Sequence, residues 1–222
     1  MNDLELLTPN NIFRTRRKSI SLIIKNNGEF IVRAPLKSTD ADIFKFINKK
    51  VNWIIKKRRE KQANQTIPLR FDKPEKITIL GNIYDLAYED NNKVKICENK
   101  IVLPKQNPKE KLVTFLKKKT NKYLTERVKH IAKTFHFNYA SISVSSAKTR
   151  WGSCNYKNKL NFTYRLILCP VDVVDYIILH ELCHTKVKNH SKKFWAEVEK
   201  CLPDYKIQEK WLKTNKTIIE II

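Results

Sequence analysis

Residues 171–186 read VDVVDYIILHELCHTK, and this stretch predicts the element around which the chain folds. Apolar residues fill most positions up to Leu182 and lie on nearly all sides of a helix, so the helix is expected deep in a core. Pro170 stands directly before it, where the missing N–H of proline costs no intrahelical hydrogen bond. The sequence therefore predicts a buried helix that begins after Pro170.

Within this helix, residues 180–184 read HELCH, which is the H-E-x-x-H pattern. His180 and His184 are four positions apart, so their imidazoles share one helix face and can bind the same metal ion. Glu181 is rotated off that face, where it makes a poor third ligand but can reach a water molecule on the metal. A chance match in a core helix is the alternative, and it is weak because three of the five histidines fall within residues 180–190.

A catalytic zinc ion usually takes three protein ligands and keeps one position open, so a third donor is required. His190 is the preferred candidate, because it follows His184 closely and Asn189 can adopt the left-handed conformation that turns a chain back after a helix. Glu197 and Glu199 compete with it from the next predicted helix. We therefore expect one zinc ion per chain, or another divalent metal in its place, bound by His180, His184 and His190.

The composition indicates a folded chain with reduced thiols. Its 222 residues are 41% hydrophobic, enough for one sizeable core or for one core with a small appended module. The five cysteines are odd in number, widely spaced and without any C-x-x-C pair. Residues 1–5 lack the layout of a secretory signal, and no apolar run has the length of a membrane span. We expect a cytoplasmic protein with no membrane contact, and the oligomeric state is not predicted.

The net charge of +23 would attract nucleic acid, anionic lipid or a polyanionic substrate. Most of the basic residues are lysine, and isoleucine and asparagine are also abundant, a combination that an AT-rich genome produces without selection for binding. Residues 56–61, KKRREK, are the most concentrated basic run. No aromatic residue interleaves with them, so a solvated helix end is favoured over a grip on a phosphate backbone. Nucleic-acid binding remains an alternative.

The first hundred residues are predicted to be mostly β-strand. Three hairpins are expected, each with a turn between two apolar runs, at 19–24 with 30–32, 77–80 with 83–88, and 94–96 with 100–103. After the first hairpin, apolar residues recur at helical spacing from a cap within 38–40 to the basic run that ends at 61.

The pattern changes after Pro104 and Pro108, first to a long amphipathic helix over 112–131. Strands at 140–144 and 159–163 follow, and they are expected to pair across a turn at 155–158. We therefore expect a boundary near residue 105, with a mostly-β module containing one helix at 1–105 and a catalytic domain at 106–222.

The segments around HELCH match one family in order along the chain. They read KTRWGSC at 148–154, YRLI at 164–167, DY at 175–176, NHS at 189–191, FW at 194–195 and PDY at 203–205. With these segments the chain resembles the YgjP-like (SprT-related) metallopeptidase-domain proteins of bacteria over nearly its whole length. Thr163, Tyr164 and Thr185 depart from the pattern of that family, at positions that concern local packing and not metal binding.

The resemblance implies an α+β fold, in which a mostly-β amino-terminal part precedes a minigluzincin-like zinc metallopeptidase core whose active-site helix packs on a small sheet. It also supports His190 as the third ligand. Arg150 and Trp151 would line the cleft, with Arg150 either stabilising negative charge that develops in the reaction or anchoring a loop to a carboxylate. Gly152 is expected at a turn that no side chain would allow.

The favoured function is that of a zinc-dependent hydrolase, most specifically a metallopeptidase. Glu181 would take a proton from the zinc-bound water as the water attacks a peptide carbonyl, and would return it to the leaving amine. The peptide substrate is expected to lie extended along the strand at 160–163, held by main-chain hydrogen bonds.

Two alternatives stay open. The same activated water can attack a phosphoanhydride, which would make the protein a nucleoside triphosphate pyrophosphatase that draws its nucleotide substrate with its positive charge. The protein can instead be a nucleic-acid-associated module, with a SprT-like protease that acts on bound partners.

Overall fold

The computed structural model describes residues 6–25, 28–63, 69–71 and 75–222. Contacts between Cα atoms divide the chain into two units, Met1–Thr66 and Ile67–Ile222. Each unit has its own hydrophobic core. The division lies at 66/67 and not near residue 105, where the change of sequence pattern suggested it.

The first unit contains a three-stranded sheet in the order β1-β3-β2. Its strands are β1 (Asn11–Thr15), β2 (Ser21–Ile24) and β3 (Phe30–Pro35). Strands β2 and β3 are antiparallel, which confirms the expected hairpin, and β1 runs parallel to β3. Gly28 in the hairpin turn has φ 81°, a conformation that glycine adopts without strain, while residues 26–27 lie outside the described residues.

The single helix expected over 38–61 is two helices, α2 (Asp40–Asn48) and α3 (Val51–Ala63). One straight helix of this length would reach about 36 Å, whereas the six residues of β3 span only about 20 Å. The break at Lys49 and Lys50 lets both helices pack on the same short sheet. Their shared core consists of Phe30, Val32, Ala34, Ile43, Ile47 and Ile54.

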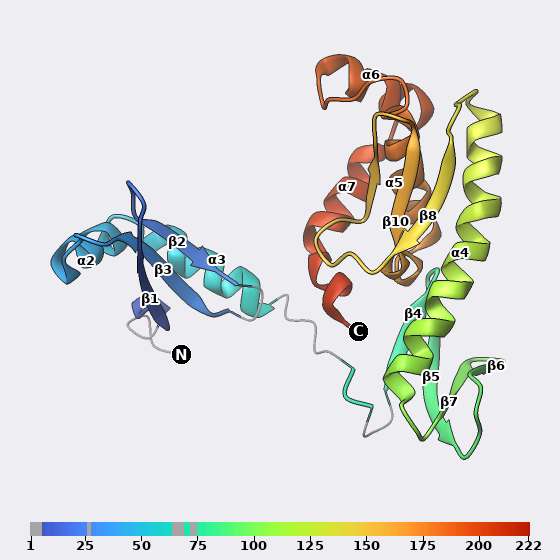
Figure 1. The fold of residues 1–222 in the computed structure, drawn as a ribbon, viewed down its shortest axis with the longest axis horizontal. Coiled ribbons are helices and arrows are strands. Elements are labelled where there is room, and N and C mark those ends of the chain that lie inside the picture. The colour runs from blue at the N-terminus through green and yellow to red at the C-terminus, as the bar shows by residue number, and fades with distance from the viewer. Residues whose placement is uncertain (1–5, 26–27, 64–68, 72–74) are drawn as a thin grey trace. The chain divides into compact units, whose positions relative to one another are not determined.

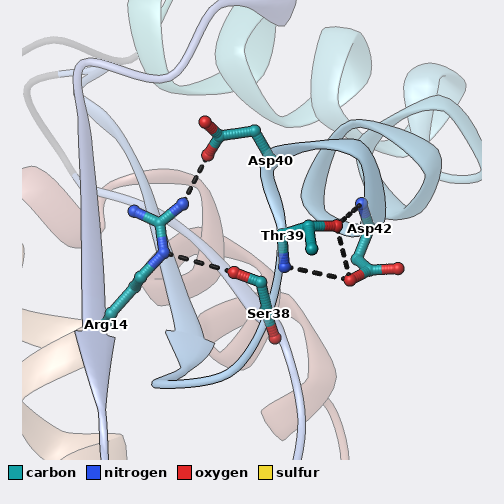
Figure 2. A network of polar contacts seen from close by, with 5 residues as sticks. All are labelled: Arg14, Ser38, Thr39, Asp40 and Asp42. Carbon is teal, nitrogen blue, oxygen red and sulfur yellow. Dashed lines mark hydrogen bonds and ion pairs between the residues drawn. The ribbon is translucent and has the colours of Figure 1, made fainter.

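Figure 2 shows the polar contacts that begin α2. Thr39 is the N-cap, and its hydroxyl accepts a hydrogen bond from the Asp42 N–H (3.2 Å) while the Asp42 carboxylate accepts one from the Thr39 N–H (3.0 Å). This reciprocal pair is a capping box. Arg14 of β1 forms an ion pair with Asp40 and donates to the Ser38 carbonyl, so the first strand is tied to the start of the helix.

The second unit begins with a four-stranded sheet in the order β4-β5-β7-β6. Its strands are β4 (Lys76–Ile79), β5 (Asn82–Glu89), β6 (Lys95–Cys97) and β7 (Lys100–Pro104). The two remaining predicted hairpins are both confirmed, because β4 pairs antiparallel with β5 and β6 with β7. Leu80 and Gly81 have φ 51° and 85°, as a two-residue hairpin turn with both residues left-handed requires.

The long predicted helix is α4 (Pro108–Thr134), and it runs past both sheets of the second unit (Figure 1). Leu112 and Leu116 near its beginning belong to the core cluster of the β4–β7 sheet. Leu124 and Val128 nearer its end belong to the cluster built around the HELCH helix. Because one helix buries its apolar face against both, β4–β7 belong to the same unit as the HELCH helix.

A second, three-stranded sheet has the order β8-β10-β9. Its strands are β8 (Ser141–Ser145), β9 (Gly152–Cys154) and β10 (Lys159–Thr163). The expected pairing of residues 140–144 with 159–163 exists, but it is parallel. The turn at 155–158 instead joins β9 to β10, because only antiparallel strands can be linked by so short a connection.

The HELCH helix is α5 (Val171–Cys183), with Pro170 as its N-cap residue. It packs against β9 and the helices α4, α6 (Lys192–Cys201) and α7 (Tyr205–Thr214). Arg127 of α4 binds the Asp175 carboxylate with both Nε and Nη2, the Nε contact at 2.7 Å, which fixes α4 to α5. The architecture is mixed α+β, with six α-helices and three small sheets in the described residues. None of the described helices has the length and apolar character needed to cross a membrane.

Candidate metal centre

The three histidines singled out in the sequence lie together. His180 is in the last turn of α5, His184 is its C-cap residue, and His190 lies in the loop before α6. One ring nitrogen from each lies within 4.8 Å of the others. The His190 Nε2 is 3.1 Å from the His180 Nε2 and 3.2 Å from the His184 Nε2.

These distances fit a shared metal ion. Two imidazole nitrogens on a tetrahedral zinc ion, each about 2.0–2.1 Å from it, lie about 3.3 Å apart. The two Nε2 separations of 3.1 and 3.2 Å are close to that value. A ligand set of three imidazoles also suits zinc chemically, whereas magnesium and calcium prefer oxygen donors.

A backbone contact sets the ring state of His184. Its Nδ1 lies 2.9 Å from the Val187 carbonyl oxygen, which can only accept, so Nδ1 carries the proton and donates it. The lone pair of Nε2 is therefore directed toward the other two histidines, as in metal sites where the second ring nitrogen is held by a carbonyl. The His180 Nδ1 is buried and has no hydrogen-bond partner among the described residues, so Nε2 makes all the polar contacts of that ring.

Aromatic side chains lie against the rings of the three histidines, of which His184 is buried and His190 is exposed. Phe194 stacks on His184 with ring centroids 4.3 Å apart and lies 4.9 Å from His180. Trp195 lies 5.9 Å from His190 and stacks on Tyr205 at 5.4 Å.

Burial lowers the pKa of His180 to about 3, and the neighbouring histidines act in the same direction. Burial also lowers the pKa of His184. Neutral imidazole is the form that binds metal.

Glu181 lies in van der Waals contact with the backbone of β9. It is only 6% exposed, and a Cβ added to Gly152 would stand 2.7 Å from both its Cγ and its Oε1. Burial raises the pKa of the Glu181 carboxyl to about 7, and the charge of Arg150 acts in the opposite direction. Gly152 does not have a positive φ, so it is required by this close approach and not by the turn that the sequence suggested.

The close approach of Gly152 to Glu181 leaves no room for a side chain at position 152. In a Gly152→Ala variant the added methyl group must displace the carboxylate or β9, and misplacement of a catalytic group by about 1 Å can cost about 100-fold in rate. We expect hydrolysis to fall by about that factor while the bound metal stays unchanged. Turnover and metal content are measured beside Ser153→Ala, which should lose less than about twofold. Wild-type turnover in Gly152→Ala would show that the position of the carboxylate does not matter.

The structure places Arg150 and Trp151 differently from each other. Arg150 is exposed, acts on the Glu181 carboxyl through its charge, and forms no ion pair with the described residues. The described residues therefore show no carboxylate to which Arg150 anchors a loop, which was one of its two expected roles. The Trp151 side chain is half-buried against the core, and its carbonyl accepts a hydrogen bond from the Thr163 N–H (3.0 Å). Substrate contact by either residue stays a prediction.

Lys188 is a residue that the sequence did not single out. It lies between the second and third histidines, and its Nζ donates to the Asn155 carbonyl (2.9 Å) and to the Asn158 Oδ1 (2.5 Å). It also lies 3.7 Å from the Cys154 Sγ. Lys188 therefore ties the segment between His184 and His190 to the turn that joins β9 to β10. Nothing in the sequence pairs a lone lysine with a turn thirty residues away.

The competing ligands are not part of the cluster. Glu197 forms an ion pair with Lys186 (3.5 Å), and neither Glu197 nor Glu199 belongs to the group of close ligand atoms found among the described residues. The left-handed turn expected at Asn189 is wrong: its φ is not positive, and its side-chain oxygen instead accepts a hydrogen bond from the Ser191 N–H (3.3 Å). Cys183 is fully buried in the core, as expected from its position off the ligand face.

Comparison with known proteins places this site in a family. The solved structures similar to the chain include the metallopeptidase zymogens of Pyrococcus abyssi abylysin and Methanocaldococcus jannaschii jannalysin. The first is 23% identical over 41% of this chain and 92% of its own, with a TM-score of 0.38. The second is 26% identical over 40% and 91%, with a TM-score of 0.36. No curated protein matches. The model of the YgjP-like metallopeptidase domain matches residues 18–215, and the chain therefore belongs to the YgjP-like metallopeptidase-domain family.

Proposed function

We propose that this protein is a zinc-dependent metallopeptidase with the zinc ion bound by His180, His184 and His190 and with Glu181 as the general base. The observation that carries the proposal is the convergence of three imidazole nitrogens, at 3.1 and 3.2 Å, beside a buried carboxylate on the same helix. Family membership supports a metal-dependent peptidase. The choice of zinc rests on the all-nitrogen ligand set.

The roles of the protein groups follow from their placement. Zinc, when bound, would polarise the peptide carbonyl and lower the pKa of a water molecule to about 7. Glu181 takes a proton from the attacking water and returns it to the leaving amine. The backbone of Gly152 leaves room for that carboxylate, and the aromatic rings of Phe194 and Trp195 hold the imidazoles in place. Arg150, exposed beside Glu181, stabilises negative charge on the substrate carbonyl oxygen.

We propose a different strand for the peptide from the one expected from the sequence. Strand β10, which contains residues 160–163, is central in its sheet, with β8 on one side and β9 on the other. Its main-chain groups are already paired, so it cannot hold a substrate. Strand β9 is at the edge and lies beside Glu181. We propose that the peptide pairs with the outer edge of β9, in a minigluzincin-like arrangement of edge strand and active-site helix.

Hydrolysis of nucleoside triphosphates is the second candidate. Two cations near the site, Arg150 and Lys188, favour it. The charge of Arg150 lowers the pKa of Glu181, and the charge of Lys188 lowers the pKa of His184. The three imidazoles weigh against it, because triphosphate hydrolysis usually employs magnesium held by oxygen ligands. The cytoplasmic location remains a proposal, supported by five free cysteines.

Two substrate panels with the purified protein distinguish the candidates. A mixture of unstructured peptides and a set of nucleoside triphosphates are each incubated with the zinc-loaded protein, and products are identified by mass spectrometry. We expect cleaved peptide bonds, loss of cleavage after chelation, and its recovery with added zinc. Cleavage of triphosphates alone would reject the peptidase proposal and select the pyrophosphatase.

A further inference from the structure

The first unit carries a groove that the metal centre does not use. It is about 230 Å³ in volume and is lined by Ser21 and Leu22 of β2, Phe46 of α2, Trp53 of α3 and Lys50 between the two helices. Trp53 is 42% exposed, which is unusual for the largest side chain of a small unit. The lining is therefore an aromatic and aliphatic surface with a single cation.

Two of the residues that line the groove, Ser21 and Leu22, belong to a strand at the edge of its sheet. Strand β2 is the last strand in the order β1-β3-β2, and β3 is its only strand partner within the described residues. An open edge presents a row of main-chain donors and acceptors that readily pair with another chain. An extended peptide that adds to such an edge obtains affinity from its main chain and specificity from the side-chain pockets beside it. Here the pocket formed by Leu22, Phe46 and Trp53 lies beside that edge.

The charge around the groove determines which peptides it suits. Residues 6–63 contain fifteen lysines and arginines against four aspartates and glutamates. Lys50 lines the groove itself, and Arg17 donates a hydrogen bond to the Ser21 hydroxyl (2.9 Å) at its rim. A peptide with acidic residues on either side of an apolar anchor would be attracted, and a basic peptide would be repelled.

We propose that this groove binds an extended, acidic polypeptide segment, which adds as a fourth strand to the outer edge of β2 and places an apolar side chain against Trp53 and Phe46. Single-stranded nucleic acid is the other polyanion that a basic unit attracts. The groove favours a peptide because its lining holds one cation and three apolar side chains, and because its strand edge offers main-chain pairing that nucleic acid does not use.

The test uses the full chain carrying Glu181→Gln, so that the probe is not cut. The probe is a fluorescein-labelled ten-residue peptide with a central Leu-Val-Phe run and Asp or Glu at the flanking positions, and binding is followed by fluorescence anisotropy. We expect Trp53→Ala and Lys50→Glu each to weaken binding at least about tenfold. Phe44→Ala, which removes another exposed aromatic of α2 outside the groove lining, should change it less than twofold. A peptide with Lys at the flanks should bind at least tenfold more weakly.

Strand addition has a second signature. On peptide binding, the main-chain amides within residues 21–24 should become protected from hydrogen exchange, and Trp53→Phe, which keeps an aromatic ring, should retain most of the affinity. Equal binding of acidic and basic peptides, unchanged binding by Trp53→Ala, or no added protection in β2 would overturn the proposal. A labelled oligothymidylate of twenty nucleotides is tested in parallel. If it binds in a way that depends on Trp53 while the acidic peptide does not bind, the proposal is also overturned.

Discussion

Replacing Glu181 by glutamine is expected to lower peptide hydrolysis by about a thousandfold and to leave the zinc content at one ion per chain. General base catalysis contributes about 10²- to 10⁴-fold, and the amide is nearly the same size as the carboxylate but cannot accept the proton. Because Glu181 is not one of the three converging ligands, its replacement should not disturb the metal. Turnover of a peptide and the zinc content of the same sample are measured together.

The control for this variant is Glu197→Gln, which removes a carboxylate on α6 that pairs with Lys186 and lies outside the cluster. It should retain turnover within about twofold. If Glu181→Gln lost its zinc, the carboxylate would be a ligand and the assigned role would be wrong. If it kept near wild-type turnover, another group would have to supply the base.

The second large effect is expected from His190→Ala. Removing one of three ligands should weaken zinc binding by more than about 100-fold, because even the loss of a supporting group outside the ligand set costs about 10- to 100-fold. Peptidase activity at limiting zinc should disappear with the metal. Zinc affinity is measured by competition with a chromogenic chelator, and activity is measured across added zinc concentrations.

His130→Ala serves as the matched control, since His130 is exposed on α4 and is not part of the cluster. It should bind zinc as the wild type does. Wild-type affinity in His190→Ala would return Glu197 and Glu199 to consideration as the third ligand, although Glu197 would first have to leave its ion pair with Lys186.

The local features of the site could be predicted from the sequence because they depend on spacing along one helix. His180 and His184 lie four positions apart, and the α-helical backbone of His184 keeps its ring beside that of His180 even though α5 has ended. The position of His190 also follows, because the six residues from His184, the C-cap residue of α5, to His190 are enough for the chain to turn back. The three hairpins were predictable for a related reason, since each is decided by a turn between two apolar runs.

The features that depend on tertiary packing could not be predicted. The contact between Gly152 and Glu181 joins residues far apart in the chain and requires β9 to occupy the sheet edge. The parallel pairing of β8 and β10 could not be predicted, because an alternating pattern identifies strands but not the direction in which they pair. The division at 66/67 was missed because the change of composition after residue 104 marks the start of α4, a helix that covers two sheets and so unites what precedes and follows it.

The aromatic residues beside the histidines were only partly predictable from the sequence. Phe194, Trp195 and Tyr205 could be identified only through the segments shared with the family, because no spacing rule connects them to the histidines. Only the structure shows what they contact: Phe194 lies against the imidazoles and Trp195 stacks on Tyr205. Comparable support of ligand rings is usual where a metal site must be held rigid.

The most direct test of a zinc-dependent peptidase is the metal content of the purified wild-type protein, measured by elemental analysis together with hydrolysis of an unstructured peptide before and after chelation. We expect one zinc ion per chain, loss of peptide cleavage when the zinc is removed, and recovery when zinc returns. A folded protein that contains no metal and gains neither metal nor activity on addition of zinc would contradict this expectation, and the three histidines would then be structural.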